Sequence, residues 1–221
     1  MPKIKVPKSS PSIDMTPMVD LAFLLVTFFM LTATLRSPEP VIVDSPSSIS
    51  EKMVPENMMM VTVDRDGRVF INITGKEART EVLTQMESKY GIQLGKERED
   101  KFALMTTHGC TMKELPTYLD TPGEKLSSFP TKGIPTDSLD NQLKDWIFYG
   151  NIALLNSAKT AYEQAKLDGK DPEVADFKPK YVLKVDSKAL YKRAQEVIDI
   201  FGELRLYNLN FVTSLEEAPK N

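Results

Sequence analysis

The sequence predicts an α/β (α+β) domain of two layers, a sheet plus helices, preceded by a single transmembrane helix. Three observations lead to this class. A run of apolar residues near the N-terminus contains one charged residue, an alternating strand-turn-strand pattern with an amphipathic helix follows it, and a strand-helix-strand pattern closes the chain. We expect the last two patterns to form one small sandwich.

Residues 1–14 contain three prolines and three lysines and are predicted to form an extended cytoplasmic tail. Residues 15–35 are predicted to form the transmembrane helix. From Pro17 to Leu35 the only charged residue is Asp20. About 19 helical residues at roughly 1.5 Å each reach about 28 Å, close to the thickness of the hydrocarbon layer. Asp20 is therefore expected at or just inside the membrane boundary, where an ionisable residue indicates a functional site.

Three other interpretations of this segment stay open. It is compatible with a buried core helix, although Leu21 to Met30 is apolar on all sides apart from Thr27, whereas core helices usually have a more polar face. A cleaved signal peptide would use the basic tail and the small residues around Ala33, but Pro17 and Asp20 fit that poorly. Finally, Thr16 as N-cap and Pro17 at the first helical position would place Asp20 where the helix dipole favours a negative charge, which is a structural role.

A polar face runs along the same helix. Asp20, Thr27 and Thr34 recur at helical spacing, so they share one side. Because threonine can bond to its own backbone and a carboxylate cannot, we expect this face to point at other helices rather than at lipid. The candidate site is therefore Asp20, with Thr16 and Pro17 at the helix start and Thr27 and Thr34 along the polar face.

Charge indicates the orientation. The chain carries 28 basic and 31 acidic residues. Three lysines precede the helix and only Arg36 lies directly beyond it, which predicts a cytoplasmic N-terminus and an exported C-terminal part, periplasmic in a bacterium. Residues after position 35 sum to −4, and this acidic balance argues against nucleic acid as a partner.

Residues 36–57 are rich in proline and serine, and they predict a flexible periplasmic linker in which only Val41 to Val43 resembles a short edge strand. The periplasmic domain covers residues 58–221. It begins with a hairpin, strands Met58 to Val63 and Arg68 to Thr74 around a turn that ends in Gly67. A helix from Ala78 to Tyr90, ended by Gly91, follows.

The domain closes with a strand from Tyr181 to Val185, a helix capped by Asp186 or Ser187 and running through Phe201, and a strand from Leu206 to Val212. Leu190 is expected on the core face of that helix. The apolar last strand should not remain a bare edge, so we expect a homodimer.

An insertion at residues 92–179 separates the two patterns. Its first part is rich in proline and predicts loops, and a long helix from about Asp137 to Leu167, capped at Gly169, follows. The apolar face of that helix is explained by packing against the α/β domain, or else by docking of a second subunit.

Enzymatic chemistry, cofactors and metals are not expected. No nucleophile with a base, no phosphate loop and no glycine fingerprint appears. His108 and Cys110, the single histidine and the single cysteine, are too few for a zinc site, and one cysteine allows no intramolecular disulfide.

The stretch Ile13-Asp-Met-Thr-Pro-Met-Val-Asp20 and the closing Lys184-Val-Asp-Ser-Lys188 resemble the ExbD/TolR family of ion-motor subunits. The resemblance covers about 130 residues, on both sides of the insertion. Family members usually lack a block like this insertion. In that family the membrane aspartate carries the ion, which implies Asp20 here. A proton is favoured over sodium, because a sodium site needs several oxygen ligands.

The resemblance implies an ExbB/TolQ-like multi-span protein around a dimer of this chain, in a proton-motive-force-driven inner-membrane motor. An ExbD-type subunit would energise a TonB-like protein and transport across the outer membrane, and a TolR-like subunit would serve envelope integrity. The remaining alternative is a passive, membrane-tethered protein that contacts peptidoglycan or another envelope component. A tether should tolerate Asp20→Leu.

Overall fold

One five-stranded sheet joins the start and the end of the globular part of the chain. The computed structural model describes residues 16–32, 47–48, 57–122, 125–126, 129–137, 140–169, 173–212 and 214–215. In the order β4-β3-β2-β5-β6, the strands are β4 Thr107–His108, β3 Val69–Ile73, β2 Met58–Val63, β5 Lys180–Val185 and β6 Leu209–Val212. The central β2 pairs antiparallel with β3 and parallel with β5. This mixed sheet with its helices confirms the α+β class.

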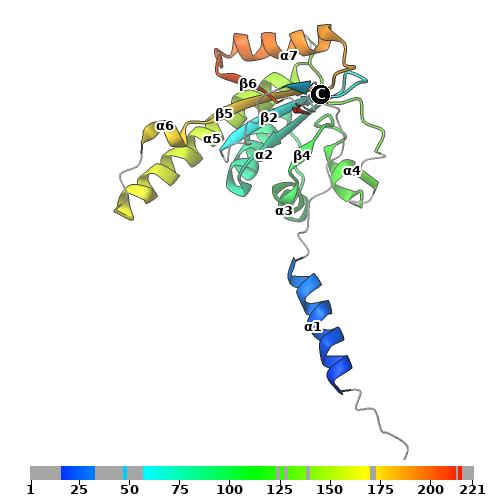
Figure 1. Cartoon of the computed structure of the whole chain (residues 1–221). Coiled ribbons are helices and arrows are strands. Elements are labelled where there is room, and N and C mark those ends of the chain that lie inside the picture. Colours follow the sequence, from blue (N-terminus) through cyan, green and yellow to red (C-terminus); the bar gives the residue numbers. More distant parts are fainter. Residues whose placement is uncertain are drawn as a thin grey trace, which may run out of the picture. The chain divides into compact units, whose positions relative to one another are not determined.

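The chain divides into two units, Met1–Arg36 and Ser37–Asn221. In the first unit the described element is the helix α1, Thr16–Thr32. The second unit holds the sheet and the remaining helices (Figure 1).

The long helices share one core with one face of the sheet. The register sets Met59 beside Tyr181 and Val61 beside Leu183, so these side chains lie on the same face. They form one buried cluster with residues of α2 (Lys76–Tyr90), α5 (Gln142–Leu167) and α7 (Tyr191–Glu203). The Tyr181 ring lies 6.1 Å from the Phe201 ring of α7, and the Tyr181 hydroxyl donates to Asn151 of α5 at 2.5 Å. The helices therefore form the second layer of the sandwich.

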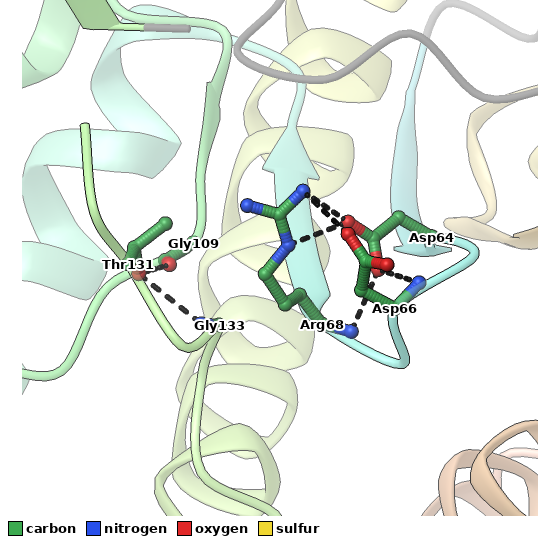
Figure 2. A network of polar contacts seen from close by, with 6 residues as sticks. All are labelled: Asp64, Asp66, Arg68, Gly109, Thr131 and Gly133. Atoms are coloured by element: carbon green, nitrogen blue, oxygen red, sulfur yellow. Dashed lines mark hydrogen bonds and ion pairs between the residues drawn. The ribbon is translucent and has the colours of Figure 1, made fainter. Parts of the chain in front are cut away.

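The hairpin turn is held by a buried carboxylate. Asp64 Oδ1 accepts from the backbone N–H groups of Asp66 and Arg68 at 2.9 and 2.8 Å, and Arg68 Nε donates to Asp64 Oδ2 at 2.6 Å (Figure 2). Gly67 supplies the positive φ of 77° that the turn requires. The predicted hairpin is confirmed, and its turn chemistry fixes the register of β2 against β3.

The insertion is part of the core. It forms α3 (Lys96–Leu104), β4, α4 (Leu115–Asp120), α5 and the short α6 (Val174–Phe177). The expected loops are present in the described residues between α4 and α5, but residues 96–120 form two helices and a short strand where loops were also expected. The elements of the insertion bury a large apolar set among the described residues: Phe102, Leu115, Tyr118, Leu119, Leu143, Trp146, Ile147 and Leu154. The helices α3 and α4 are too short for a clear period in the sequence, and Pro116 is compatible with the first turn of α4.

A loop of the insertion also lies against β3. The backbone N–H of Ile134 donates to the Val69 carbonyl at 2.9 Å, and the Thr131 hydroxyl donates to the Gly109 carbonyl (Figure 2). Gly133 has a φ of +84°, and a Cβ there would lie 2.5 Å from the Val69 nitrogen. Only glycine allows this close backbone approach.

Several predicted boundaries are corrected. The closing helix begins at Tyr191, because the Asp186 side chain accepts from the Lys188 N–H at 2.8 Å and forms a turn instead of a helix cap. Leu190 is consequently 69% exposed and is not a core residue. The last strand begins at Leu209, and α5 begins at Gln142, where the Asn141 side chain accepts from the Lys144 N–H at 3.0 Å.

Part of the linker pairs with the end of the chain. Strands β1 (Ser47–Ser48) and β7 (Ser214–Leu215) form a parallel pair. The predicted tail at residues 1–14, the possible strand at Val41 to Val43 and the polar-face residue Thr34 lie outside the described residues.

Candidate functional site

The helix α1 is apolar on all sides except at Asp20 and its threonines. Its sequence from Thr16 to Thr32 has one ionisable residue and a continuous run from Leu21 to Val26 without a polar side chain. Ten of its apolar side chains are more than half exposed: Met18, Val19, Leu21, Phe23, Leu24, Leu25, Val26, Phe28, Phe29 and Met30. An all-round apolar surface of this kind requires an apolar environment or partner helices.

Within the described ranges, no helix combines the length and the hydropathy required of a membrane-crossing segment. The described part of α1 has 17 residues. The transmembrane assignment of residues 15–35 therefore stays a prediction from the sequence.

Asp20 lies near the beginning of α1, on the surface of the helix. A shallow hollow there is lined by Thr16, Pro17, Val19, Asp20 and Phe23. Two of the other predicted site residues, Thr16 and Pro17, thus lie beside Asp20 in the hollow. Val19 and Phe23 were not among the predicted site residues. Phe23 follows Asp20 at i+3 and could have been expected beside it, whereas sequence spacing gives no such signal for Val19.

Thr27 lies two turns further on the same face, because positions i and i+7 nearly coincide around a helix. Its hydroxyl donates to the Leu24 carbonyl at 2.9 Å, and the side chain is half-buried. This bond confirms that Thr27 is satisfied by its own backbone. A carboxylate accepts hydrogen bonds only, so it cannot donate to a backbone carbonyl as the Thr27 hydroxyl does, and Asp20 is the one ionisable side chain among residues 16–32.

Comparison with known proteins identifies the family. A family model described as "Biopolymer transport protein ExbD/TolR" matches residues 7–216. The chain belongs to the ExbD/TolR family. Neither the curated proteins nor the solved structures contain a match.

Membership of the ExbD/TolR family assigns the chain to biopolymer transport, and members of this family are non-enzymatic transport proteins. The matched range includes the stretch from Ile13 to Asp20 and the closing strand-helix-strand pattern, on which the sequence resemblance rests. Residues 92–179 lie between these two parts, inside the bounds of the match.

His108 and Cys110, the residues considered for a metal, belong to that core. The His108 ring lies 4.4 Å from the Trp146 ring, and Cys110 is buried near Tyr118, where burial raises the pKa of its thiol. Among the described residues, no group of three His, Cys, Asp or Glu side chains is placed to hold a metal ion.

Proposed function

We propose that the chain is the ExbD-type subunit of a proton-motive-force-driven inner-membrane motor that energises transport across the outer membrane, with Asp20 as the proton carrier. The observation that carries this proposal is the single carboxylate in an otherwise apolar helix. Family membership supports the motor class, and the motif from Ile13 to Asp20 supports the choice of residue.

The proposed topology has residues 1–14 in the cytoplasm, residues 15–35 in the inner membrane and the globular part in the periplasm. The apolar surface of α1 and the lysines that precede it support this orientation. A single helix forms no pore, so the polar face with Asp20 and Thr27 requires helices of another protein, an ExbB/TolQ-like multi-span partner. A TonB-like protein would receive the motion.

The mechanism rests on the two states of one carboxyl group. When partner helices enclose it, the neutral acid is compatible with apolar surroundings and the anion is not. The carboxyl group would take up a proton on one side of the membrane and release it on the other. Each change of charge would change the surface of the partner protein against which α1 packs best. The free energy of the proton gradient would thereby shift or rotate the helix.

Asp20→Asn tests this mechanism, because the amide keeps the size and hydrogen bonding of the side chain but cannot release a proton. We expect normal co-purification with the membrane partner and a loss of gradient-dependent uptake in cells. Asp20→Glu should retain part of the activity, since its chemistry is unchanged. Asp199→Asn, the same chemical change on the exposed surface of α7, is the control and should be fully active.

The outcome also separates the alternative functions. If Asp20→Asn and Asp20→Leu are both fully active, the motor proposal fails and a passive tether that contacts peptidoglycan remains. If uptake is intact without this chain but the envelope becomes leaky, and Asp20→Asn reproduces the leak, the chain has the TolR-like role.

We also propose that two copies associate through β6. This strand lies at the edge of the sheet, and Phe211 in its middle is 57% exposed. An apolar edge strand is expected to pair. Light scattering of the detergent-solubilised chain should give a dimer, and Phe211→Glu should shift it towards monomer. A wild-type monomer at high concentration, both alone and with the membrane partner, would contradict this.

A further inference from the structure

A cavity of about 470 Å³ opens at one end of the sheet, far along the sequence from Asp20. It lies between the second half of α5, the loop after α6 and the starts of β2, β5 and α2. The lining residues are Asn57, Thr74, Gly75, Ser157, Ala158, Ala161, Phe177, Lys178 and Lys180. Its size is in the range of sites for small ligands. Two walls of the cavity, α5 and α6, belong to the insertion. The helix α5 continues beyond the strands and runs alongside α6 there (Figure 1).

The walls of the cavity are held in place without a ligand. Asn57 Nδ2 donates to the Phe177 carbonyl at 2.8 Å, and the Lys180 N–H donates to the Asn57 carbonyl at 3.0 Å. The Phe177 ring packs edge-on against Tyr162 of α5, with ring centroids 5.9 Å apart. Thr74 is bonded to the backbone of Met58 in both directions. The cavity is therefore preformed, which lowers the entropic cost of binding.

The electrostatics of the cavity favour an anion. Lys178 and Lys180 line it, no lining residue is acidic, and neither ammonium group has an ion pair among the described residues. Gly75, at the N-terminal end of the 15-residue α2, offers no side-chain cap to the free N–H groups of the first turn. Two lysines without ion pairs among the described residues therefore line the cavity together with Gly75 at the start of α2, whose first turn also carries Glu77 outside the lining.

The remaining polar atoms favour a peptide over a simple anion. Because Nδ2 of Asn57 is bonded to Phe177, its Oδ1 is left as an acceptor, and an acceptor suits a ligand with an N–H group. Ser157 adds a hydroxyl that has no hydrogen bond among the described residues, and Ala158 and Ala161 leave room for small apolar side chains. We propose that this cavity binds the carboxylate-bearing end of a short peptide, either a C-terminal α-carboxylate or an acidic side chain.

The test is a ligand-observed NMR titration of the full chain in detergent with four probes: N-acetyl-dialanine, its C-terminal amide, N-acetyl-aspartyl amide and inorganic phosphate. We expect the free acid of dialanine or the aspartyl amide to bind in the millimolar range, and the neutral dialanine amide at least tenfold more weakly. Whichever acid binds identifies the source of the carboxylate. Phosphate binding as tight as that of both acids, or no binding of either acid, would overturn the proposal.

Variants assign the binding to this cavity. Lys178→Gln combined with Lys180→Gln should weaken acid binding at least tenfold, and Ala161→Leu should weaken it by filling the space, while circular dichroism stays unchanged. Lys159→Gln on α5, outside the lining, is the matched control and should bind as the wild type does. Equal weakening by the control and the double variant would show non-specific attraction and contradict the assignment. Neither variant touches α1, so this result is independent of the proposed motor function.

Discussion

His108 illustrates how a single residue takes its properties from the fold. Its ring lies 4.4 Å from the Trp146 ring and 5.0 Å from the Phe102 ring, and its Nε2 has no hydrogen-bond partner among the described residues. Burial lowers the pKa of His108 to about 3. The imidazole is therefore neutral in the folded protein at neutral and mildly acidic pH.

This burial predicts a loss of stability in acid. The unfolded chain binds a proton at His108 below its ordinary pKa of about 6.5, whereas the folded chain does so only near 3. The contribution of the buried, neutral His108 to the free energy of unfolding is fully present above pH 6.5. Below pH 6.5 the free energy of unfolding falls by up to about 1.4 kcal/mol per pH unit. Between pH 7.5 and pH 5, His108→Phe should therefore lose about 2 kcal/mol less than the wild type in urea unfolding. Parallel losses in the two proteins would show that His108 is not the acid-sensitive group.

At the scale of elements, the helix α5 has one face buried in the core and one face exposed to solvent. Leu154 is fully buried, and its neighbour Leu155 is 49% exposed, although both are leucines in the same helix. Of the interpretations offered by the sequence, packing against the α/β domain is correct for the first half of this helix: Leu143, Trp146, Ile147 and Leu154 all belong to the common core.

A matched pair of substitutions checks this division. Leu154→Ala should lower the free energy of unfolding by about 2 to 5 kcal/mol, because it leaves a cavity in a packed core. Leu155→Ala should change it by less than about 1 kcal/mol, since the side chain is already in contact with water. Chemical unfolding of both variants measures the difference. Similar losses would mean that Leu155 is covered in the protein, for example by a second subunit.

At the scale of the whole molecule, the globular unit has one core that includes the insertion. The buried cluster combines residues of strands β2, β3 and β5 with residues of helices inside the insertion and of the helices α2 and α7 outside it. Such a core cannot lose its middle segment without exposing the apolar faces of what remains.

We therefore expect residues from Pro55 onward to form a soluble domain that unfolds in one cooperative transition, without any disulfide. Replacing residues 92–179 by a short glycine-serine linker should abolish that transition, because α5 and its buried Trp146 are lost. Urea unfolding followed by circular dichroism compares the two proteins. A cooperatively folded deletion protein would show that the insertion is an addition to a self-sufficient domain.

The sequence alone determined what depends on local pattern. The hairpin around Gly67, the helix ended by Gly91 and the strand from Tyr181 have strong turn and period signals, and the structure has them within about two residues. The lone charge in an apolar helix singled out Asp20 in the same way. Its proton-carrying role is a prediction that the proposed substitutions test.

Only the tertiary structure decided what depends on contacts between distant residues. The segments that form α3 and α4 have no clear helical period of apolar residues. They are helical because the burial of Phe102 and Tyr118 outweighs their weak local preference for a helix. The tertiary structure moved the start of the last helix to Tyr191, since Asp186 bonds within its own turn. It also brought Lys178 and Lys180 beside Gly75, about 100 residues away in the chain, and no local pattern of residues predicts that cavity.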